Sequence, residues 1–272
     1  MHIISSIVLG IVEGVTEFLP ISSTAHMMIA AQFLGLDQTD FLKTFEIVIQ
    51  LGAILAVIVL FWKRLQRSAD LWKKVLAAFI PTGIIGLILY KLIKNYLLGN
   101  LNVALWALLI GGVILWAFEL WYQNRIKGKK NGKAVRPGSA YEIAPVTLDT
   151  LTYGQAAAIG TAQAIAVIPG VSRSGATIVS GMIVGLSRED IVDFSFLLAI
   201  PTMIAATGYD LVKSGASLSG GQWLPLVIGF IVAFIAALAS VRWLLSYVRK
   251  NNFIPFAIYR IALALILLLI LR

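Results

Sequence analysis

Two acidic side chains lie four residues apart in an otherwise apolar part of the chain, within the segment EGVTEFLPISSTAH at residues 13–26. In a helix, Glu13 and Glu17 would share one face. Such a pair can bind a hard divalent cation through oxygen ligands, or can work as general acid and base. Inside a membrane each carboxylate would cost about 2.5–3.5 kcal/mol, so the pair implies a cavity, a metal or a cationic partner. The alternative is a protonated, hydrogen-bonded pair without a catalytic role.

Three hydroxyl residues follow directly after the break at Pro20: Ser22, Ser23 and Thr24. A helix that restarts here would offer hydroxyl caps and free N–H groups, which attract phosphate. Ser22 and Thr24 are therefore predicted to bind substrate, although capping alone would also explain either one. Ser23 shares a helix face with His26. That pair fits a nucleophile with its base, or an attacking hydroxyl with an acid for the leaving group, and a purely structural histidine is the alternative.

A second segment, IPGVSRSGAT at residues 168–177, carries an arginine between two serines. Proline and Gly170 interrupt the apolar stretch, and Arg173 would begin the next helix between Ser172 and Ser174. Arginine is costly in lipid, and its guanidinium matches phosphate oxygens in a bidentate fashion. We therefore predict an anion clamp at Arg173 and count Gly170 with the substrate-binding residues. A buried ion pair with one glutamate is the alternative, but it does not explain why the hydroxyl groups repeat.

Together the two segments supply paired carboxylates, a hydroxyl–imidazole pair, two helix N-termini and an arginine. This inventory is typical of phosphoryl transfer, in which catalysis is mostly positioning and charge stabilisation. A transporter of a lipid phosphate is the rival interpretation, because broken helices in inverted repeats are common in secondary transporters. An ion channel fits poorly, since the charged residues do not follow one another along a single span.

The composition is that of a polytopic membrane protein. Of 272 residues, 59% are hydrophobic and 13% are charged, and the mean hydropathy is +0.90, whereas a soluble domain has about 25% charged residues. The net charge of +9 is explained by basic loops that set topology and meet anionic lipid, so nucleic acid is not an expected partner. Without cysteine the chain has no disulfide and no thiolate metal site. No cleavable signal peptide is expected, because the apolar start lacks basic residues.

An all-α membrane fold with six full spans and two re-entrant helical hairpins is predicted. The spans are expected at residues 44–62, 75–92, 103–122, 191–212, 223–248 and 253–271, each near the length that crosses the hydrocarbon core. Residues 3–35 and 154–185 are also apolar, but proline breaks each near its middle. Each is therefore expected to form two half-helices, with a bend that is buried in protein or lines a wet cavity.

The two hairpins align at an offset of 150 residues, GIVEGVTEFLPISSTAHMMIAAQFLGL (10–36) with GTAQAIAVIPGVSRSGATIVSGMIVGL (160–186). Glu13 aligns with Gln163. Three predicted spans lie between the hairpins, and an odd number inverts the second copy, so the halves are expected to be inverted-topology repeats whose broken helices meet near the midplane. We expect one integral domain, with repeat 1 at about 1–122, a cytoplasmic loop at 123–150 and repeat 2 at about 151–272.

Basic residues gather in three loops, at 63–74, 123–153 and 249–252, whereas the loops at 95–102 and 214–222 contain none. The positive-inside rule makes the basic loops cytoplasmic. Both termini and the opening of the first hairpin then face outside, and the second hairpin opens from the cytoplasm.

Other polar residues in the apolar segments are weaker signals. Glu46 and Gln50 share a helix face and are expected to support the site. Four more lie near span ends, where snorkelling is the expected behaviour: Glu119, Asp193, Asp210 and Arg260.

The two polar segments resemble the two motifs of the undecaprenyl-diphosphate phosphatase family, bacterial membrane phosphatases associated with bacitracin resistance. The matching stretches are EGVTEFLPISSTAH and PGVSRSGAT. Three further stretches also look like family segments: KTFEIVIQLGAILAV, SFLLAIPTM and FIPFAIYR. The resemblance therefore covers nearly the whole chain. Ala25 stands where glycine is frequent in the family, but no reactive group is lost.

The resemblance implies hydrolysis of undecaprenyl diphosphate to the monophosphate, which recycles the lipid carrier for cell-wall polymers, at a site facing the outer leaflet of the bacterial cytoplasmic membrane. It also implies a divalent cation, Mg²⁺ or Ca²⁺. Carried over by position, Glu13 and Glu17 would bind metal or position the acid–base group, and Ser23 and His26 would be the reacting pair. The diphosphate would be held by Arg173 together with Ser172, Ser174 and Thr177.

Sequence leaves the nucleophile open between Ser23, His26 and water. It also leaves the oligomeric state open, and a homodimer is compatible with it.

Overall fold

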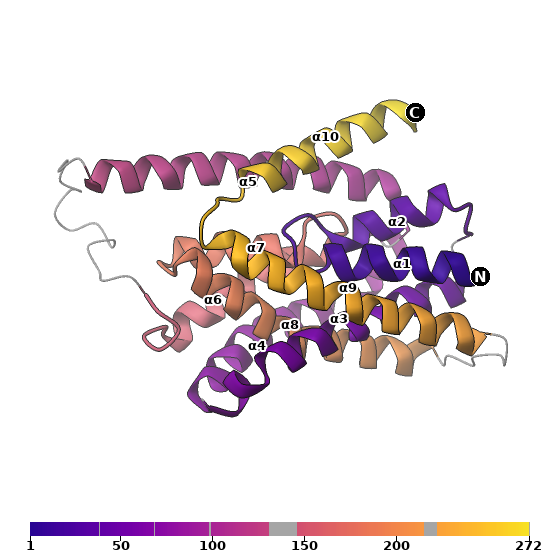
Figure 1. Cartoon of the computed structure of the whole chain (residues 1–272), viewed down its shortest axis with the longest axis horizontal. Helices are drawn as coiled ribbons and strands as arrows, with labels where there is room; N and C mark the ends of the chain where they lie inside the picture. The colour runs from indigo at the N-terminus through magenta and orange to yellow at the C-terminus, as the bar shows by residue number, and fades with distance from the viewer. Residues whose placement is uncertain (38, 68, 98, 131–145, 215–221, 272) are drawn as a thin grey trace.

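The computed structural model describes residues 1–272 except 38, 68, 98, 131–145, 215–221 and 272 (Figure 1). The described part is helical throughout, and its one extended pairing is an isolated bridge between Val146 and Leu186. It contains ten α-helices, which fall into two sets of five in the same order: two short helices, then three longer ones.

The first five helices are α1 (Ile3–Thr16), α2 (Ser23–Phe33), α3 (Asp40–Arg67), α4 (Ala69–Leu92) and α5 (Leu101–Lys130). The next five are α6 (Tyr153–Gln163), α7 (Arg173–Ile183), α8 (Arg188–Ser214), α9 (Trp223–Val248) and α10 (Ile254–Ile270). Two short non-α turns extend α4 and α6: η1 (Ile93–Leu97) and η2 (Ala164–Val167).

Five of these helices are long and apolar enough to cross a membrane: α3, α4, α5, α8 and α9. They contain the first five predicted spans. The sixth predicted span is α10, an apolar helix of 17 residues. At 1.5 Å per residue it is about 26 Å long, somewhat less than the roughly 30 Å hydrocarbon core.

Both proline-containing stretches form a short helix, a turn and a second short helix, as the sequence predicts. The same offset of 150 residues appears in the backbone, because Ser22 (φ 71°) and Ser172 (φ 78°) both have positive φ immediately before the second short helix. Gly35 (φ 63°) and Gly185 (φ 105°) end these helices in the left-handed region that glycine tolerates best.

The packing of the two sets also corresponds. α1 packs on α9, and its counterpart α6 packs on α4. At each of these two contacts a glycine lets the helix backbones approach closely. A Cβ on Gly10 would lie 2.7 Å from the carbonyl oxygen of Gly229, and a Cβ on Gly160 would overlap the carbonyl oxygen of Ala78. Across the sets, α3 contacts α8 and α5 contacts α10.

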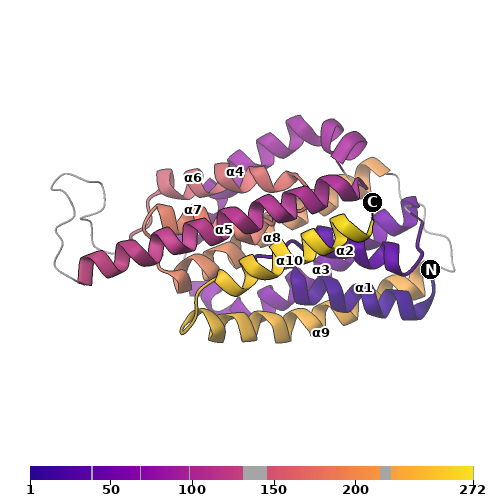
Figure 2. The same cartoon turned by 90° about the horizontal axis from the view of Figure 1, so that it is seen from above.

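The chain termini lie together at one end of the molecule, and α5 and α9 finish at the opposite end (Figures 1 and 2). Helix α5 continues through residues 123–130, so the connection predicted at 123–150 begins later than expected, and most of it, 131–145, lies outside the described residues. Lys74 then anchors the chain after this connection by donating to the carbonyls of Leu148 (3.1 Å) and Asp149 (2.8 Å).

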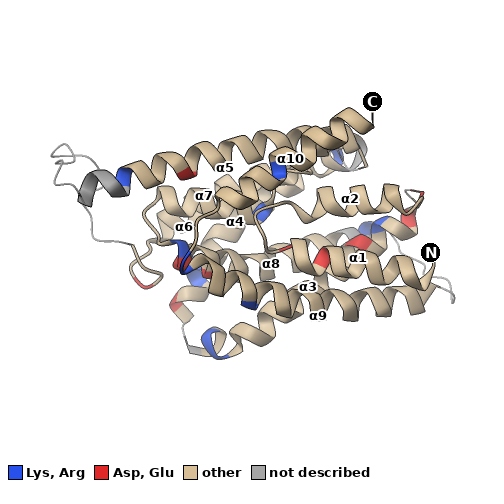
Figure 3. Ribbon diagram, turned by 45° about the horizontal axis from the view of Figure 1, so that its top comes forward, with Lys and Arg blue, Asp and Glu red and all other residues tan. Residues whose placement is uncertain are grey.

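The outer surface is largely apolar, which is the arrangement a protein in lipid requires. Large side chains on several helices are about half exposed or more, including Ile88, Trp106, Ile114, Ile231 and Leu269. Charged residues are sparse along the middle of the helices and gather toward the end where α5 and α9 finish (Figure 3).

Snorkelling was the wrong expectation for three of the polar residues near span ends. Glu119 is fully buried and forms an ion pair with Arg188, and Asp193 pairs with Arg64. Arg260 is only 1% exposed. These side chains find partners inside the protein because they face neighbouring helices, so they do not need to reach the interface; the side chain of Asp210 lies outside the described residues.

Candidate active site

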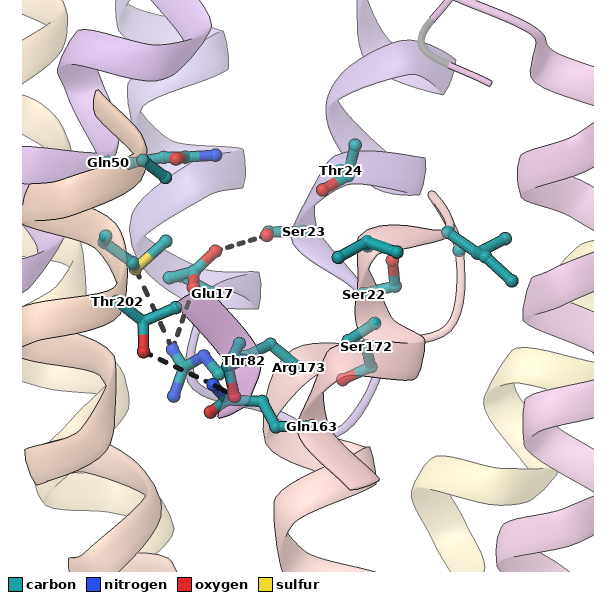
Figure 4. Close-up of a pocket in the computed structure, with 16 residues that line it drawn as sticks. Glu17, Ser22, Ser23, Thr24, Gln50, Thr82, Gln163, Ser172, Arg173 and Thr202 are labelled. Carbon is teal, nitrogen blue, oxygen red and sulfur yellow. Dashed lines mark hydrogen bonds and ion pairs between the residues drawn. The ribbon is translucent and has the colours of Figure 1, made fainter. Parts of the chain in front are cut away.

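A cavity of about 190 Å³ lies where the two broken helices meet, and α3, α4 and α8 complete its walls (Figure 4). Seven residues predicted from the motifs line it: Glu17, Ser22, Ser23, Thr24, Gly170, Ser172 and Arg173. Pockets that enclose a whole drug-sized ligand measure about 300–1,000 Å³. This cavity therefore suits a compact polar group whose remainder lies outside.

The turn between α1 and α2 brings a carboxylate to a hydroxyl. Glu17 follows the last residue of α1, and Ser23 is the first residue of α2. The Ser23 hydroxyl donates a hydrogen bond to Oε2 of Glu17, and both side chains are almost completely buried. A carboxylate that accepts the proton of a serine hydroxyl is the arrangement of a general base with its nucleophile.

The other oxygen of Glu17 faces the arginine of the second hairpin. Nη2 of Arg173 lies 2.9 Å from Oε1 of Glu17, and Nη1 donates to the carbonyl of Ser195 at 2.9 Å. The ring of Phe18 lies 5.7 Å from the guanidinium carbon. The ion pair considered as the alternative for Arg173 is therefore present. Nε of Arg173 has no hydrogen-bond partner among the described residues, so a donor remains for an anion.

The two restarted helices differ at their N-termini. Ser172 caps α7, because its hydroxyl accepts a hydrogen bond from the Gly175 N–H at 3.1 Å. Ser22 makes no side-chain cap on α2. The first N–H groups of α2 are thus left for another acceptor, and they adjoin Ser23 and Thr24 in the cavity wall. An uncapped helix N-terminus beside an arginine is a favourable place for phosphate.

His26 does not pair with Ser23, contrary to the prediction from their helical spacing. Its Nδ1 lies 2.7 Å from the carbonyl oxygen of Ser22, and its Nε2 lies 2.8 Å from the hydroxyl of Tyr259. Both ring nitrogens are used, and the imidazole stacks on the Tyr259 ring outside the cavity lining. Spacing along α2 could not reveal this, because Tyr259 belongs to α10, far away in the sequence.

Ser174 and Thr177, which the resemblance assigns to the diphosphate, do not line the cavity either. Ser174 donates to the carbonyl of Leu19 at 2.7 Å and so ties α7 to the first turn. Thr177 is fully buried, and its hydroxyl lies 2.6 Å from that of Ser195, the residue whose carbonyl holds Arg173. Both residues therefore support the site from behind the cavity wall.

Glu13 lies outside the cavity lining, one helical turn before Glu17. It is fully buried, no N–H or O–H group of the described residues donates to its carboxyl oxygens, and its carboxyl group lies beside that of Glu17. Oε1 of Glu46 is likewise without a partner, and Glu13 interacts electrostatically with Glu17, Glu46 and Arg173. No group of three potential metal ligands gathers in the described part of the chain. The free oxygens are nevertheless donors of the type that Mg²⁺ and Ca²⁺ accept.

The sequence analysis did not predict a neutral polar cluster that also lines the cavity (Figure 4). Gln163 donates through Nε2 to the hydroxyls of Thr82 (3.1 Å) and Thr202 (3.3 Å). These hydroxyls donate to the carbonyls of Gly160 (2.6 Å) and Leu198 (2.7 Å), so they can only accept from Gln163. The amide orientation is therefore fixed, and Oε1 of Gln163 is left without a partner among the described residues.

A sequence signal for this cluster was available. The tripeptide Ile-Pro-Thr occurs twice, at residues 80–82 and 200–202, within α4 and α8. Proline inside a helix lacks an N–H and frees a carbonyl, and a neighbouring threonine can compensate for this locally. Gln50, which was expected only to support the site, also lines the cavity.

Fold and site together define a class: a polytopic α-helical protein with an apolar exterior and an interior cavity equipped to bind an anionic group beside a hydroxyl–carboxylate pair. Residues 6–266 match the family described as "Bacitracin resistance protein BacA". The chain belongs to this family. Membership and five apolar helices make it a bacterial membrane protein.

Relatives similar over nearly their full length carry one name. The chain is 50% identical to a protein named undecaprenyl-diphosphatase from Aquifex aeolicus, over 96% of this chain and 95% of the relative. It is 45% identical to the protein of the same name from Persephonella marina, over 99% of both chains. The Thermus thermophilus protein of that name is 44% identical, over 95% of this chain and 94% of the relative.

Proposed function

We propose that the protein is an undecaprenyl-diphosphate phosphatase, which hydrolyses undecaprenyl diphosphate to undecaprenyl phosphate and inorganic phosphate and so recycles the lipid carrier for cell-wall polymers. The names of its relatives support this function. The single observation that carries it is the contact of Glu17 with Ser23 on one oxygen and with Arg173 on the other, inside a small cavity. A cavity of this size suits the diphosphate, while the long apolar tail lies outside in lipid.

In the first step, Oγ of Ser23 attacks the terminal phosphorus and gives its proton to Glu17. A bond forms between Oγ and phosphorus, and the bond from phosphorus to the bridging oxygen breaks, so that undecaprenyl phosphate leaves. Arg173, which lines the cavity, exchanges Glu17 for the phosphate oxygens through Nη2, and its buried Nε, which has no partner in the described part of the chain, is a further donor. Donors that face the developing charge lower the barrier, and the open N-terminus of α2 adds to them.

In the second step, water attacks the phosphoserine and breaks the bond between Oγ and phosphorus. Inorganic phosphate leaves as H₂PO₄⁻ with both protons of the water, and Glu17 returns to Oγ of Ser23 the proton that it took in the first step. Carboxylate assistance of this kind contributes typically 10²- to 10⁴-fold to a rate. Gln163, whose Oε1 receives no hydrogen bond from any described residue, lines the same cavity and could hold hydroxyl-bearing groups such as water.

A divalent cation, Mg²⁺ or Ca²⁺, is part of the proposal. Glu13 and Glu17 would hold it, and when bound it would neutralise charge on the diphosphate. The fit is supported by the two buried oxygens of Glu13, which receive no donor from the part of the chain that the structure describes, and by the neighbouring carboxyl group of Glu17. Mg²⁺ in particular is usually bound by one or two carboxylates plus substrate phosphates, so a preformed three-ligand cage is not required. We expect chelation by EDTA to abolish phosphate release and added Mg²⁺ or Ca²⁺ to restore it. Full activity after chelation would show that the reaction does not need a divalent cation.

The site is proposed to face the outer leaflet of the cytoplasmic membrane, with both termini outside. The basic loops at 63–74 and 249–252 support this orientation through the positive-inside rule. In this orientation, the two halves of the chain are inverted repeats, and the hairpin of α1 and α2 opens toward the periplasmic or outer side.

The test is phosphate release from a long-chain prenyl diphosphate by the purified protein in detergent. We expect Ser23→Ala and Glu17→Gln each to lower kcat by about 10³-fold or more, because one removes the nucleophile and the other the base. Ser180→Ala is the matched control, since that hydroxyl bonds only the carbonyls of Ala176 and Thr177 within α7 and does not line the cavity.

Two results would contradict the proposal. A wild-type protein that binds the lipid but releases no phosphate would indicate a transporter instead. Substantial turnover by Ser23→Ala would leave the hydrolysis intact but remove Ser23 as the nucleophile, in favour of water or His26.

A further inference from the structure

Arg260 on α10 contacts both helix breaks, which are the turn between α1 and α2 and the turn between α6 and α7. Its Nη1 donates to the carbonyl of Pro20 (3.1 Å) in the first break, and its Nη2 donates to those of Gly170 (3.0 Å) and Val171 (3.0 Å) in the second. Its remaining contacts are with α5: Nε donates to Leu108 (3.2 Å) and Nη2 to Ala107 (3.4 Å). One guanidinium thus joins five carbonyls from three separate parts of the chain.

These contacts answer a need that broken helices create in lipid. A helix satisfies its own backbone groups, but the carbonyls at a break lose their intrahelical partners and no water replaces them. Arginine suits this task better than lysine, because its planar fork offers five N–H donors in fixed directions. The fit is close, since a Cβ added to Gly111 of α5 would collide with the guanidinium.

Among the residues that the structure describes, Arg260 has no carboxylate as counter-ion. The side chain is 1% exposed, and no acidic group in the described part of the chain forms an ion pair with it. Burying a charge without a counter-ion costs several kcal/mol, so structural bonding alone is an expensive use of an arginine. Gly170, which accepts from Arg260, also lines the cavity, so only one residue separates this positive charge from the place of the anion.

We propose that Arg260 is a positioning residue for the phosphatase reaction: it holds the two breaks in register, so that Ser23 and Arg173 meet the same phosphate group, and its unpaired charge draws the diphosphate into the cavity. This inference rests on the proposed function. It assigns α10, which contributes no residue to the cavity lining, to the catalytic apparatus.

Two substitutions separate geometry from charge. Arg260→Lys keeps the charge but cannot reach five carbonyls. We therefore expect kcat to fall at least about tenfold, because misplaced catalytic groups slow a reaction. Inhibition by inorganic pyrophosphate should change less than about threefold, because the charge is kept. Arg260→Met loses both properties, and its inhibition by pyrophosphate should weaken at least about tenfold, because an attractive charge in a low-dielectric site is removed. In both variants, amide hydrogen exchange should accelerate at residues 17–24 and 168–175 but not in α3.

Arg188→Lys is the matched control. Arg188 is also an interior arginine, but it pairs with Glu119 and stacks over Tyr122 at 4.8 Å, away from the cavity. We expect it to lower thermal stability and leave kcat and pyrophosphate inhibition within about threefold of wild type, since it removes only a remote contact.

The proposal is overturned if Arg260→Lys keeps kcat within about threefold of wild type, or loses activity with unchanged exchange at both breaks. Should Arg260→Met fail to fold, Arg260→Lys decides the matter alone. Wild-type protein without phosphatase activity would refute the proposed function, whereas the exchange and pyrophosphate measurements need no turnover and test Arg260 separately.

Discussion

At the scale of single residues, Glu17 has the central position, because its two oxygens contact the two groups to which we assign the proposed reaction. Oε2 accepts a hydrogen bond from the Ser23 hydroxyl, and Oε1 pairs with Arg173. In the proposed mechanism, an incoming phosphate would compete with Glu17 for the guanidinium of Arg173. If Arg173 turns to the phosphate as we propose, Glu17 would keep Ser23 as its remaining partner, so that binding of the anion would also prepare the nucleophile.

His26 is oriented by its two neighbours. The carbonyl of Ser22 can only accept, so Nδ1 of a neutral His26 carries the proton, and Nε2 then accepts from the hydroxyl of Tyr259. The imidazole thus supports the peptide group that precedes Ser23 and does not touch the Ser23 hydroxyl. This geometry favours a positioning role over that of a base.

His26→Ala is expected to lower kcat by about tenfold or more at every pH, since misplacement of Ser23 is costly, without removing an ionisation from the pH–rate profile. Tyr259→Phe should cost only about two- to fivefold, because one neutral hydrogen bond is worth roughly 0.5–1.5 kcal/mol and Tyr259 is partly exposed. Profiles of kcat against pH for both variants and Glu17→Gln check this. If His26→Ala lost one limb of the profile and Glu17→Gln kept it, His26 would be the base.

The residue types of the site could be predicted from sequence, but their pairing could not. Glutamate, serine and arginine are conspicuous in apolar segments, and seven of the predicted residues do line the cavity. Helical spacing suggested Ser23 with His26. The actual partner, Glu17, lies six residues earlier, across a turn that includes the positive-φ residue Ser22, and helical periodicity does not extend through such a break.

At the scale of helices, sequence predicted the breaks well and the neighbours poorly. Proline marks both interruptions, and five predicted spans fall within long apolar helices. Which helices pack together was not predictable from apolar periodicity, because a helix in lipid has no need of a single apolar stripe. Small residues carry that information instead: Gly10 and Gly14 face α9, and Gly160 faces α4.

These glycine contacts give a prediction about the two halves. Gly10→Ala would bring a Cβ to 2.7 Å from the carbonyl oxygen of Gly229. The Cβ of Gly160→Ala would overlap the carbonyl oxygen of Ala78. Each should lower stability by about 1–3 kcal/mol, as overpacking does, with the larger loss at Gly160. Unfolding in mixed detergent micelles measures this, and phosphate release should fall with it as the hairpins shift.

Gly86→Ala in α4 is the control for both. An added Cβ there meets nothing within 4 Å, so the substitution should be neutral or stabilise by up to about 1 kcal/mol through helix propensity. Equal stability of Gly10→Ala and Gly86→Ala would mean that α1 and α9 are not packed as closely as described.

At the scale of the whole molecule, the site exists only where the two halves meet. The first half supplies Glu17 and Ser23, the second supplies Arg173, and α10 joins both breaks through Arg260. Sequence indicated this meeting through the repeat at an offset of 150 residues. It could not indicate the role of α10, because an arginine near a span end looks like a snorkelling residue until its carbonyl partners are known.

The orientation of the molecule can be tested directly, because the chain contains no cysteine. The connection between α2 and α3 lies at the end that holds the termini, and the connection between α9 and α10 lies toward the opposite end (Figure 1). Asp37 in the first connection and Asn251 in the second are both exposed. If the basic loops are cytoplasmic, a membrane-impermeant maleimide added to spheroplasts should label Asp37→Cys and leave Asn251→Cys unlabelled until the membrane is permeabilised, in variants that retain phosphatase activity. The reverse pattern would turn the hairpin that carries Glu17 and Ser23 toward the cytoplasm, and the proposed hydrolysis at the outer leaflet would then be wrong.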